Sequence, residues 1–312
     1  MLCEGMSLRA ASRVADVSIN TVYKLLDDAG FVCAEFHDRM VRGLQCQRIQ
    51  ADEAWAFCYN KKENAEAVIL QDLACGDIWT WSVFDPETKL VISYIVGDRS
   101  DAFAKPLAKD ARARIATPRV QLTTDGLRTY RDAFEEAFGA DIDYATRVVI
   151  YPKKAGETDE QALSARGRRG RRHHDPLKDY GTEIVPEDGA EPGKARVEKR
   201  IISGNPDPAY ISTAFIERLN LTTRQHVRLF TRKTTGFSKR LRRHCCAVAL
   251  HFCWYNFVHI HGSLRVTPAM AAGICDRLMS MDDIVALVEA RDAPPKKRGP
   301  YKPRRPRGAI SD

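Results

Sequence analysis

Three acidic residues occupy positions where a divalent metal site could form. Asp52 lies in a strand-like segment, Asp125 ends an apolar one, and Glu217 lies near the start of a helical one. Crowded carboxylates repel one another unless cations neutralise them, and pairs of ions about 3.5–4 Å apart promote in-line displacement at phosphorus. Because oxygen ligands favour Mg²⁺ or Mn²⁺, we expect two such ions at these acids. Alternatively, each acid is only a surface salt-bridge partner.

The elements that would position these acids follow from periodicity. Strands are predicted over 47–57, 78–84, 90–96, 120–124 and 146–151, and helices over 102–115 and 127–138. The order βββαβαβ is typical of an RNase H-like α/β fold, a mixed five-stranded sheet flanked by helices. In that fold the first and fourth strands are neighbours, so Asp52 and Asp125 can face one another. A later helix can then supply Glu217.

The amino-terminal residues 1–35 resemble a DNA-binding helix-turn-helix. Two short helices are predicted between residues 7 and 29, with Ser18 capping the second and Gly30 ending it. Such a layout would present Asn20, Thr21 and Lys24 to a DNA groove. The alternative is a small helical hairpin that makes no DNA contact.

A catalytic domain is expected over 46–292, interrupted by an exposed, flexible insertion at 153–200 that is rich in charge and glycine. Helical periodicity returns at 212 and continues to about 260 with a break near Gly236. A short helix starting at Thr267-Pro268 and another over 283–290 complete a carboxy-terminal helical segment. Residues 293–312 are expected to be a disordered basic tail.

Charge distribution points to a polyanionic partner. The chain has 312 residues and a net charge of +8, and residues 217–243 contain one acid against nine basic residues. On a helix, Asn220, Arg224 and Arg228 would share a face with Glu217, where the arginines could grip the phosphates of a DNA strand. Lys239 extends the same surface. Alternatively, these charges form only a solvated face.

Other features of the chain are those of an ordinary intracellular protein. No secretory signal and no bilayer-spanning segment are readable, so we expect a soluble, cytoplasmic protein without a membrane partner. The nine cysteines contain no Cys-x-x-Cys pair and are expected to be reduced.

Several motifs resemble those of a known family. They are Ala51-Asp52-Glu53-Ala54-Trp55-Ala56-Phe57, Gln121-Leu122-Thr123-Thr124-Asp125-Gly126, Gly204-Asn205-Pro206-Asp207, residues 211–222, Gly236-Phe237-Ser238-Lys239, Tyr255-Asn256-Phe257 and residues 267–274. Together, from about residue 5 to residue 290, the chain is similar to a transposase of the insertion sequence 1 type, one of the DDE transposases. Family members usually carry a cysteine-rich zinc module before the helix-turn-helix, whereas this chain starts almost inside the latter.

The resemblance implies an enzyme that cuts and joins double-stranded DNA, both element ends and target. Two Mg²⁺ ions would be held by Asp52, Asp125 and Glu217 as the catalytic acids, with no covalent enzyme intermediate. Because two DNA ends must be handled together, we expect a homodimer or higher oligomer on DNA. The alternative is a catalytically inactive or repurposed repressor derived from a truncated transposase.

Overall fold

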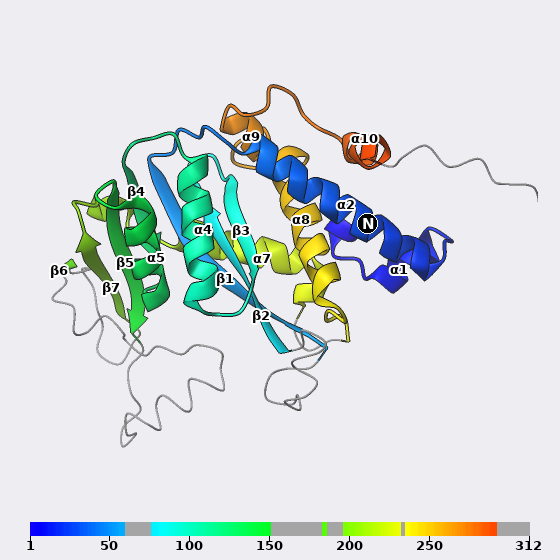
Figure 1. Ribbon diagram of the computed structural model, residues 1–312, viewed down its shortest axis with the longest axis horizontal. Coiled ribbons are helices and arrows are strands. Elements are labelled where there is room, and N and C mark those ends of the chain that lie inside the picture. The colour runs from blue at the N-terminus through cyan, green and yellow to red at the C-terminus, as the bar shows by residue number, and fades with distance from the viewer. Residues whose placement is uncertain (60–75, 151–182, 186–195, 232–234, 292–312) are drawn as a thin grey trace, which may run out of the picture.

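The computed structural model describes residues 1–59, 76–150, 183–185, 196–231 and 235–291. Seven described strands form one mixed sheet in the order β3-β2-β1-β4-β5-β7-β6 (Figure 1). The strands are β1 (Arg48–Cys58), β2 (Gly76–Phe84), β3 (Val91–Gly97), β4 (Val120–Thr124), β5 (Ile142–Ile150), β6 (Glu183–Val185) and β7 (Arg196–Ser203). The predicted mixed α/β architecture is confirmed, and the order of the first five strands is compatible with an RNase H-like fold.

The first three strands form the predicted antiparallel meander. Asp85 fixes the turn between β2 and β3, since its carboxylate accepts hydrogen bonds from the Glu87 backbone at 2.8 Å and the Thr88 hydroxyl at 2.7 Å. β4 lies parallel to β1, with Ala51 opposite Thr124. This register brings the residues that follow, 52 and 125, to the same level of the sheet.

Three expectations for the sheet and the insertion are wrong. The sheet has more than five strands, because β7 pairs antiparallel with β5 and in turn carries β6. The expected insertion therefore ends before residue 196, and β5 begins at Ile142 rather than at 146. β7 was not predicted, because charged residues interrupt its apolar residues and a strand was expected to be a run of apolar residues. Apart from β6, the remaining insertion residues up to 195 lie outside the described part of the chain, as do residues 293–312.

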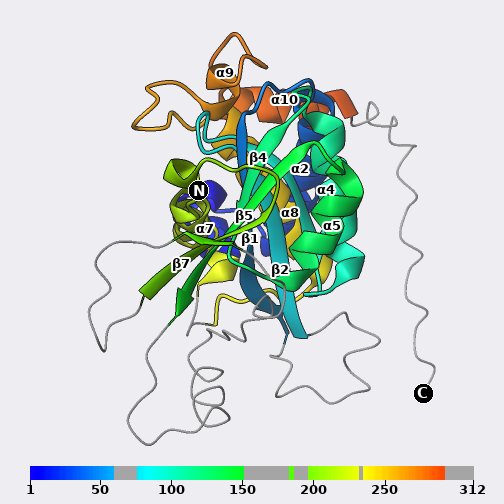
Figure 2. The same ribbon diagram turned by 90° about the vertical axis from the view of Figure 1, so that its left-hand side faces the viewer.

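Helices cover both faces of the sheet. α4 (Asp101–Arg114) and α5 (Arg128–Phe138) lie on one face, and α7 (Ala214–His226) lies on the other (Figure 2). α4 buries an alanine and leucine stripe, whereas α5 buries Tyr130, Phe134 and Phe138. None of the helices in the described residues combines the length and apolarity that a bilayer crossing requires.

The amino-terminal helices begin as predicted but end differently. Ser7 caps α1 (Leu8–Val14) and Ser18 caps α2 (Ile19–Met40). Gly30 does not end α2, which continues for ten further residues and packs against α8 (Leu241–Phe257). A Cβ atom at Gly30 would lie 2.3 Å from the Cβ of Cys246, so this glycine permits close helix contact. DNA binding by residues 1–35 stays a prediction.

The carboxy-terminal helices are shorter than the periodicity indicated. In place of one interrupted helix over 212–260, α7 ends at His226, a 3₁₀ turn spans Arg228–Phe230, and α8 starts at Leu241. Thr267 caps α9 (Pro268–Ala271) as predicted, accepting a hydrogen bond from the Met270 backbone at 3.2 Å. α10 (Met281–Arg291) is the last described helix.

Acid should destabilise the protein through His251, which is buried on α8. Among the described residues neither ring nitrogen has a hydrogen-bond partner, and burial, helped by His226 and His259, lowers the pKa of His251 to about 3. In the unfolded chain, this imidazole binds a proton near pH 6.5. The free energy of unfolding that His251 contributes is therefore complete above pH 6.5 and falls by about 1.4 kcal/mol per pH unit as the pH drops towards 3. In His251→Phe, we expect a correspondingly flatter dependence of the unfolding free energy on pH, measured by urea denaturation between pH 7 and 4. Parallel curves would contradict it.

Candidate metal centre

Three carboxylates converge where β1 and the end of β4 meet. Asp52, Glu53 and Asp125 each place a carboxylate oxygen within 4.8 Å of the others; we call them the acid cluster. The parallel register of β1 and β4 explains why Asp52 and Asp125 meet. Gly126, at φ 90°, turns the chain sharply after β4, and Asp125 accepts a hydrogen bond from the Leu127 backbone at 3.1 Å. The predicted approach of Asp52 to Asp125 is therefore present.

The third predicted acid, Glu217, lies on α7 and is not a member of the acid cluster. Its carboxylate accepts a hydrogen bond from the Thr213 hydroxyl at 2.8 Å and lies 4.0 Å from a guanidinium nitrogen of Arg147. The side chain is 59% exposed. Its negative charge nevertheless contributes to raising the pKa of Asp52, so it acts on the cluster electrostatically.

Asn220 connects α7 directly to the acid cluster. Its side-chain amide donates a hydrogen bond to Asp52 at 2.7 Å. Asn220 lies three residues after Glu217, and residues at this spacing share a helix face. The face of α7 that the sequence predicted to meet the acids does so through Asn220. Gln50 fixes the helix start, since its side chain bonds the backbones of Ser212 and Ile216.

Glu53 is the cluster member that sequence reasoning missed. Adjacent strand residues point to opposite faces, so Glu53 was not expected beside Asp52. Its side chain is only 2% exposed, accepts a hydrogen bond from the Tyr130 hydroxyl at 2.9 Å and forms an ion pair with Arg99. Two adjacent acids followed by five apolar residues in the same strand were the available signal, because carboxylates are seldom buried without a partner.

The electrostatics of the acid cluster favour a cation. Burial, then the charges of Glu53, Asp125 and Glu217, raises the pKa of Asp52 well above its usual range. Burial and Asp125 raise the pKa of Glu53 to about 7, against the opposing effects of Arg99 and Tyr130. Such repulsion is relieved by a proton or by a metal ion. Oxygen-only donors at this spacing suit Mg²⁺ or Mn²⁺, so the residues present fit the expected cofactor.

The predicted DNA-binding residues are spread over three surfaces. Asn20, Thr21 and Lys24 are exposed on α2, where Lys24 pairs with Asp28 at 2.6 Å. Arg224 lies in the last turn of α7. Arg228 falls beyond the end of that helix, so the expectation that it shares a helix face with Glu217 is wrong. Lys239 is exposed before α8. DNA contact by these residues stays a prediction.

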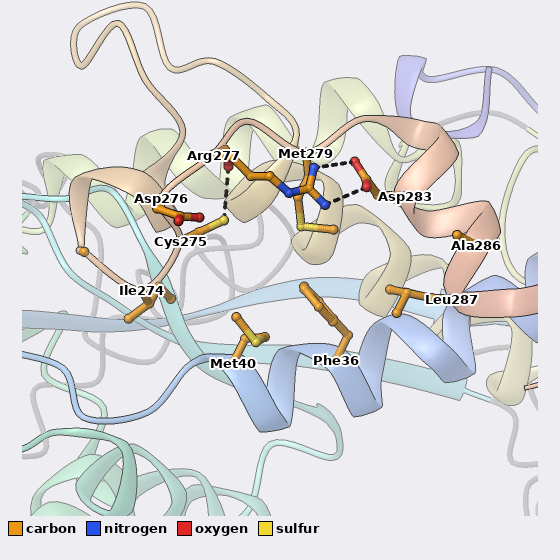
Figure 3. Close-up of a pocket in the computed structure, with 11 residues that line it drawn as sticks. Phe36, Met40, Ile274, Cys275, Asp276, Arg277, Met279, Asp283, Ala286 and Leu287 are labelled. Carbon is orange, nitrogen blue, oxygen red and sulfur yellow. Dashed lines mark hydrogen bonds and ion pairs between the residues drawn. The ribbon is translucent and has the colours of Figure 1, made fainter. Parts of the chain in front are cut away.

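A pocket of about 600 Å³ lies elsewhere, between α2 and α10 (Figure 3). Phe36 and Met40 form its floor, and an ion pair between Arg277 and Asp283 at 2.7 Å lies at its edge. No member of the acid cluster lines this pocket. The candidate metal centre is therefore separate from it.

Comparison with known proteins gives only weak structural likeness. No model of a known protein family matches the sequence, and no curated protein matches it. A solved piggyBac transposase synaptic complex with hairpin DNA is similar at 12% identity and a TM-score of 0.32, covering 81% of this chain and 55% of that one. This chain thus spans about half the length of that transposase. At such a score the likeness carries no functional weight, and the acid cluster remains the basis for a conclusion.

Proposed function

We propose that the protein is a metal-dependent polynucleotidyl transferase that cuts and joins DNA as a DDE transposase. One observation carries the proposal: Asp52 and Asp125, from neighbouring parallel strands of an RNase H-like order, converge beside the buried Glu53, and burial together with the neighbouring acidic charges raises the pKa of Asp52. Such a cluster is costly unless protons or cations neutralise part of its charge, and a metal-dependent enzyme uses cations. The motifs similar to insertion sequence 1 transposases agree with this reading.

Asp52, Asp125 and Glu217 are the proposed metal-ligating catalytic acids. Glu217 lies on the same face of α7 as Asn220, whose side chain donates a hydrogen bond to Asp52. The negative charge of Glu217 also contributes to raising the pKa of Asp52. Glu53 is a further candidate ligand from within the cluster. When bound, two Mg²⁺ ions would polarise a phosphate and acidify an attacking water or 3′ hydroxyl.

The protein's own side chains hold this arrangement. Asn220 orients Asp52 through its amide, and Arg99 compensates the charge of Glu53. Arg147, beside Glu217, offers a guanidinium on the same side of the sheet for a DNA phosphate. Double-stranded DNA is the proposed partner, bound by a homodimer or higher oligomer, with Asn20, Thr21 and Lys24 contacting the groove.

A cleavage and joining assay tests the proposal. The full chain is incubated with supercoiled plasmid and labelled duplexes taken from the DNA that flanks its coding sequence, with Mg²⁺ or with EDTA. We expect nicked plasmid and joined product only with the metal. DNA binding without either product would support the alternative, a repressor derived from a transposase. That alternative is favoured by one observation, the engagement of Glu217 with Thr213 and Arg147 outside the acid cluster.

A further inference from the structure

Glu53 is held at both carboxylate oxygens by residues that are not members of the acid cluster. One oxygen accepts a hydrogen bond from the Tyr130 hydroxyl at 2.9 Å, and the other forms an ion pair with Arg99. Tyr130 is fully buried on α5, and Arg99 lies between β3 and α4. Because two separate segments bind the two oxygens, the carboxylate cannot rotate without losing a contact. The orientation of Glu53 is therefore fixed.

Trp81 contacts both segments that hold Glu53. It is fully buried and lies directly opposite Glu53 in the β1–β2 pair, so the two side chains share a sheet face. The indole N–H of Trp81 donates a hydrogen bond at 3.0 Å to the carbonyl of Asp98, the residue before Arg99. Its ring meets the ring of Tyr130 edge-on, with centroids 5.4 Å apart. One buried side chain thus supports both contacts of the Glu53 carboxylate.

The turn after β4 connects Tyr130 to Asp125. The Leu127 backbone N–H donates a hydrogen bond to the Asp125 carboxylate at 3.1 Å, and its carbonyl accepts one from the Tyr130 backbone at 3.1 Å. α5 begins at Arg128, directly after this turn. The same short segment therefore supplies one acid of the cluster and the hydroxyl that orients Glu53.

Glu53 approaches the acid cluster from the sheet face opposite Asp52. Asp52 is bound by Asn220 on α7 and Glu53 by Tyr130 on α5, and these two helices lie on opposite faces of the sheet (Figure 2). Asp125 follows the end of β4, where an oxygen of each acid still lies within 4.8 Å of the others. At this separation in a buried site, the charge of Glu53 acts strongly on any ion held by the other two acids.

We propose that Glu53 is a positioning residue: its fixed negative charge strengthens cation binding at Asp52 and Asp125, and it does not itself ligate the ion. To ligate an ion, the carboxylate would have to share lone pairs that bind the Tyr130 hydroxyl and the Arg99 guanidinium. A fixed charge within 4.8 Å of the ligand atoms attracts a cation without leaving those partners. The inference rests on the proposed function and narrows the role of Glu53 from candidate ligand to support of the ligands.

The Mn²⁺ affinity of the full chain, measured without DNA, tests this role independently of turnover. Electron paramagnetic resonance reports the free Mn²⁺ that remains as the ion is titrated into the protein. We expect Tyr130→Phe to weaken binding about 10-fold and Glu53→Gln about 100-fold, the range for loss of a residue that supports a metal ligand. Tyr130→Phe keeps the ring and removes only the hydroxyl that orients Glu53. Its effect on Mn²⁺ binding must therefore pass through Glu53.

Tyr144→Phe is the matched control for Tyr130→Phe. The fully buried Tyr144 hydroxyl lies 2.9 Å from the Thr124 hydroxyl, so it is bound beside Asp125 but to a partner other than Glu53. Both substitutions remove one buried hydroxyl and should lower the unfolding free energy by similar amounts, measured by urea denaturation. Only Tyr130→Phe should change the Mn²⁺ affinity.

Two results would overturn the positioning role. Tighter Mn²⁺ binding by Tyr130→Phe would mean that Glu53, once released, turns to the ion as a direct ligand. Equal affinities of Tyr130→Phe and Tyr144→Phe would mean that the hydrogen bond to Glu53 is only structural. If Asp125→Asn still weakened Mn²⁺ binding in either case, the metal centre and the proposed function would stand. A full chain that neither binds Mn²⁺ nor joins DNA would remove both proposals.

Discussion

Asp125→Asn is expected to abolish Mg²⁺-dependent DNA cleavage and joining. The substitution keeps the side-chain shape and the hydrogen bond to the Leu127 backbone but removes one negative charge from the acid cluster. Loss of a residue that merely supports a metal ligand costs about 10- to 100-fold, so loss of a ligand charge should cost more than about 100-fold. Plasmid nicking and strand joining measure the effect. DNA affinity should be nearly unchanged, because phosphate contacts do not require the metal.

Asp132→Asn is the matched control for Asp125→Asn. It makes the same change of charge at an exposed position on α5. We expect wild-type activity from it. Joining retained by Asp125→Asn at the level of this control would exclude the proposed mechanism.

Thermal denaturation with Mn²⁺ adds a readout independent of turnover, since a ligand that binds only the folded chain raises its melting temperature. That rise should be smaller in Asp125→Asn.

The meeting of Asp52 and Asp125 was predictable from sequence because it depends on strand order. A parallel β1–β4 pair fixes the relative level of both residues, and alternating apolar patterns located the two strands. The position of Glu217 was harder to predict. A helix pattern identifies the face that meets the sheet, but it does not determine whether Glu217 or Asn220 contacts Asp52. Glu217 instead contacts Thr213 and Arg147, and Asn220 is the residue of α7 that reaches Asp52.

Glu53 and Gly30 show what a one-dimensional pattern omits. Alternation places Glu53 on the face opposite Asp52, yet its carboxylate still comes within ligand distance of the cluster at the end of β4. Gly30 was interpreted as a helix stop because glycine is a poor helix former. The structure assigns it instead to the contact between α2 and α8, which involves residues more than two hundred positions apart in sequence.

Gly30→Ala should therefore destabilise the fold even though alanine favours helices. The new Cβ would lie 2.3 Å from Cys246 Cβ and 2.4 Å from its Cα, and the backbone atom cannot move without displacing α8. Overpacking of this severity costs about 3 kcal/mol, whereas the gain in helix propensity is about 1 kcal/mol. We expect the unfolding free energy to fall by about 2 kcal/mol, measured by urea denaturation.

Gly262→Ala provides the comparison for Gly30→Ala, because no atom lies within 4 Å of the Cβ position at Gly262 and its φ is not in the left-handed region. That variant should change stability by no more than about 0.5 kcal/mol. Cys246→Gly removes one of the clashing atoms, so adding it to Gly30→Ala should recover part of the loss beyond the sum of the two single effects. Wild-type stability of Gly30→Ala would mean that α2 and α8 are further apart than described.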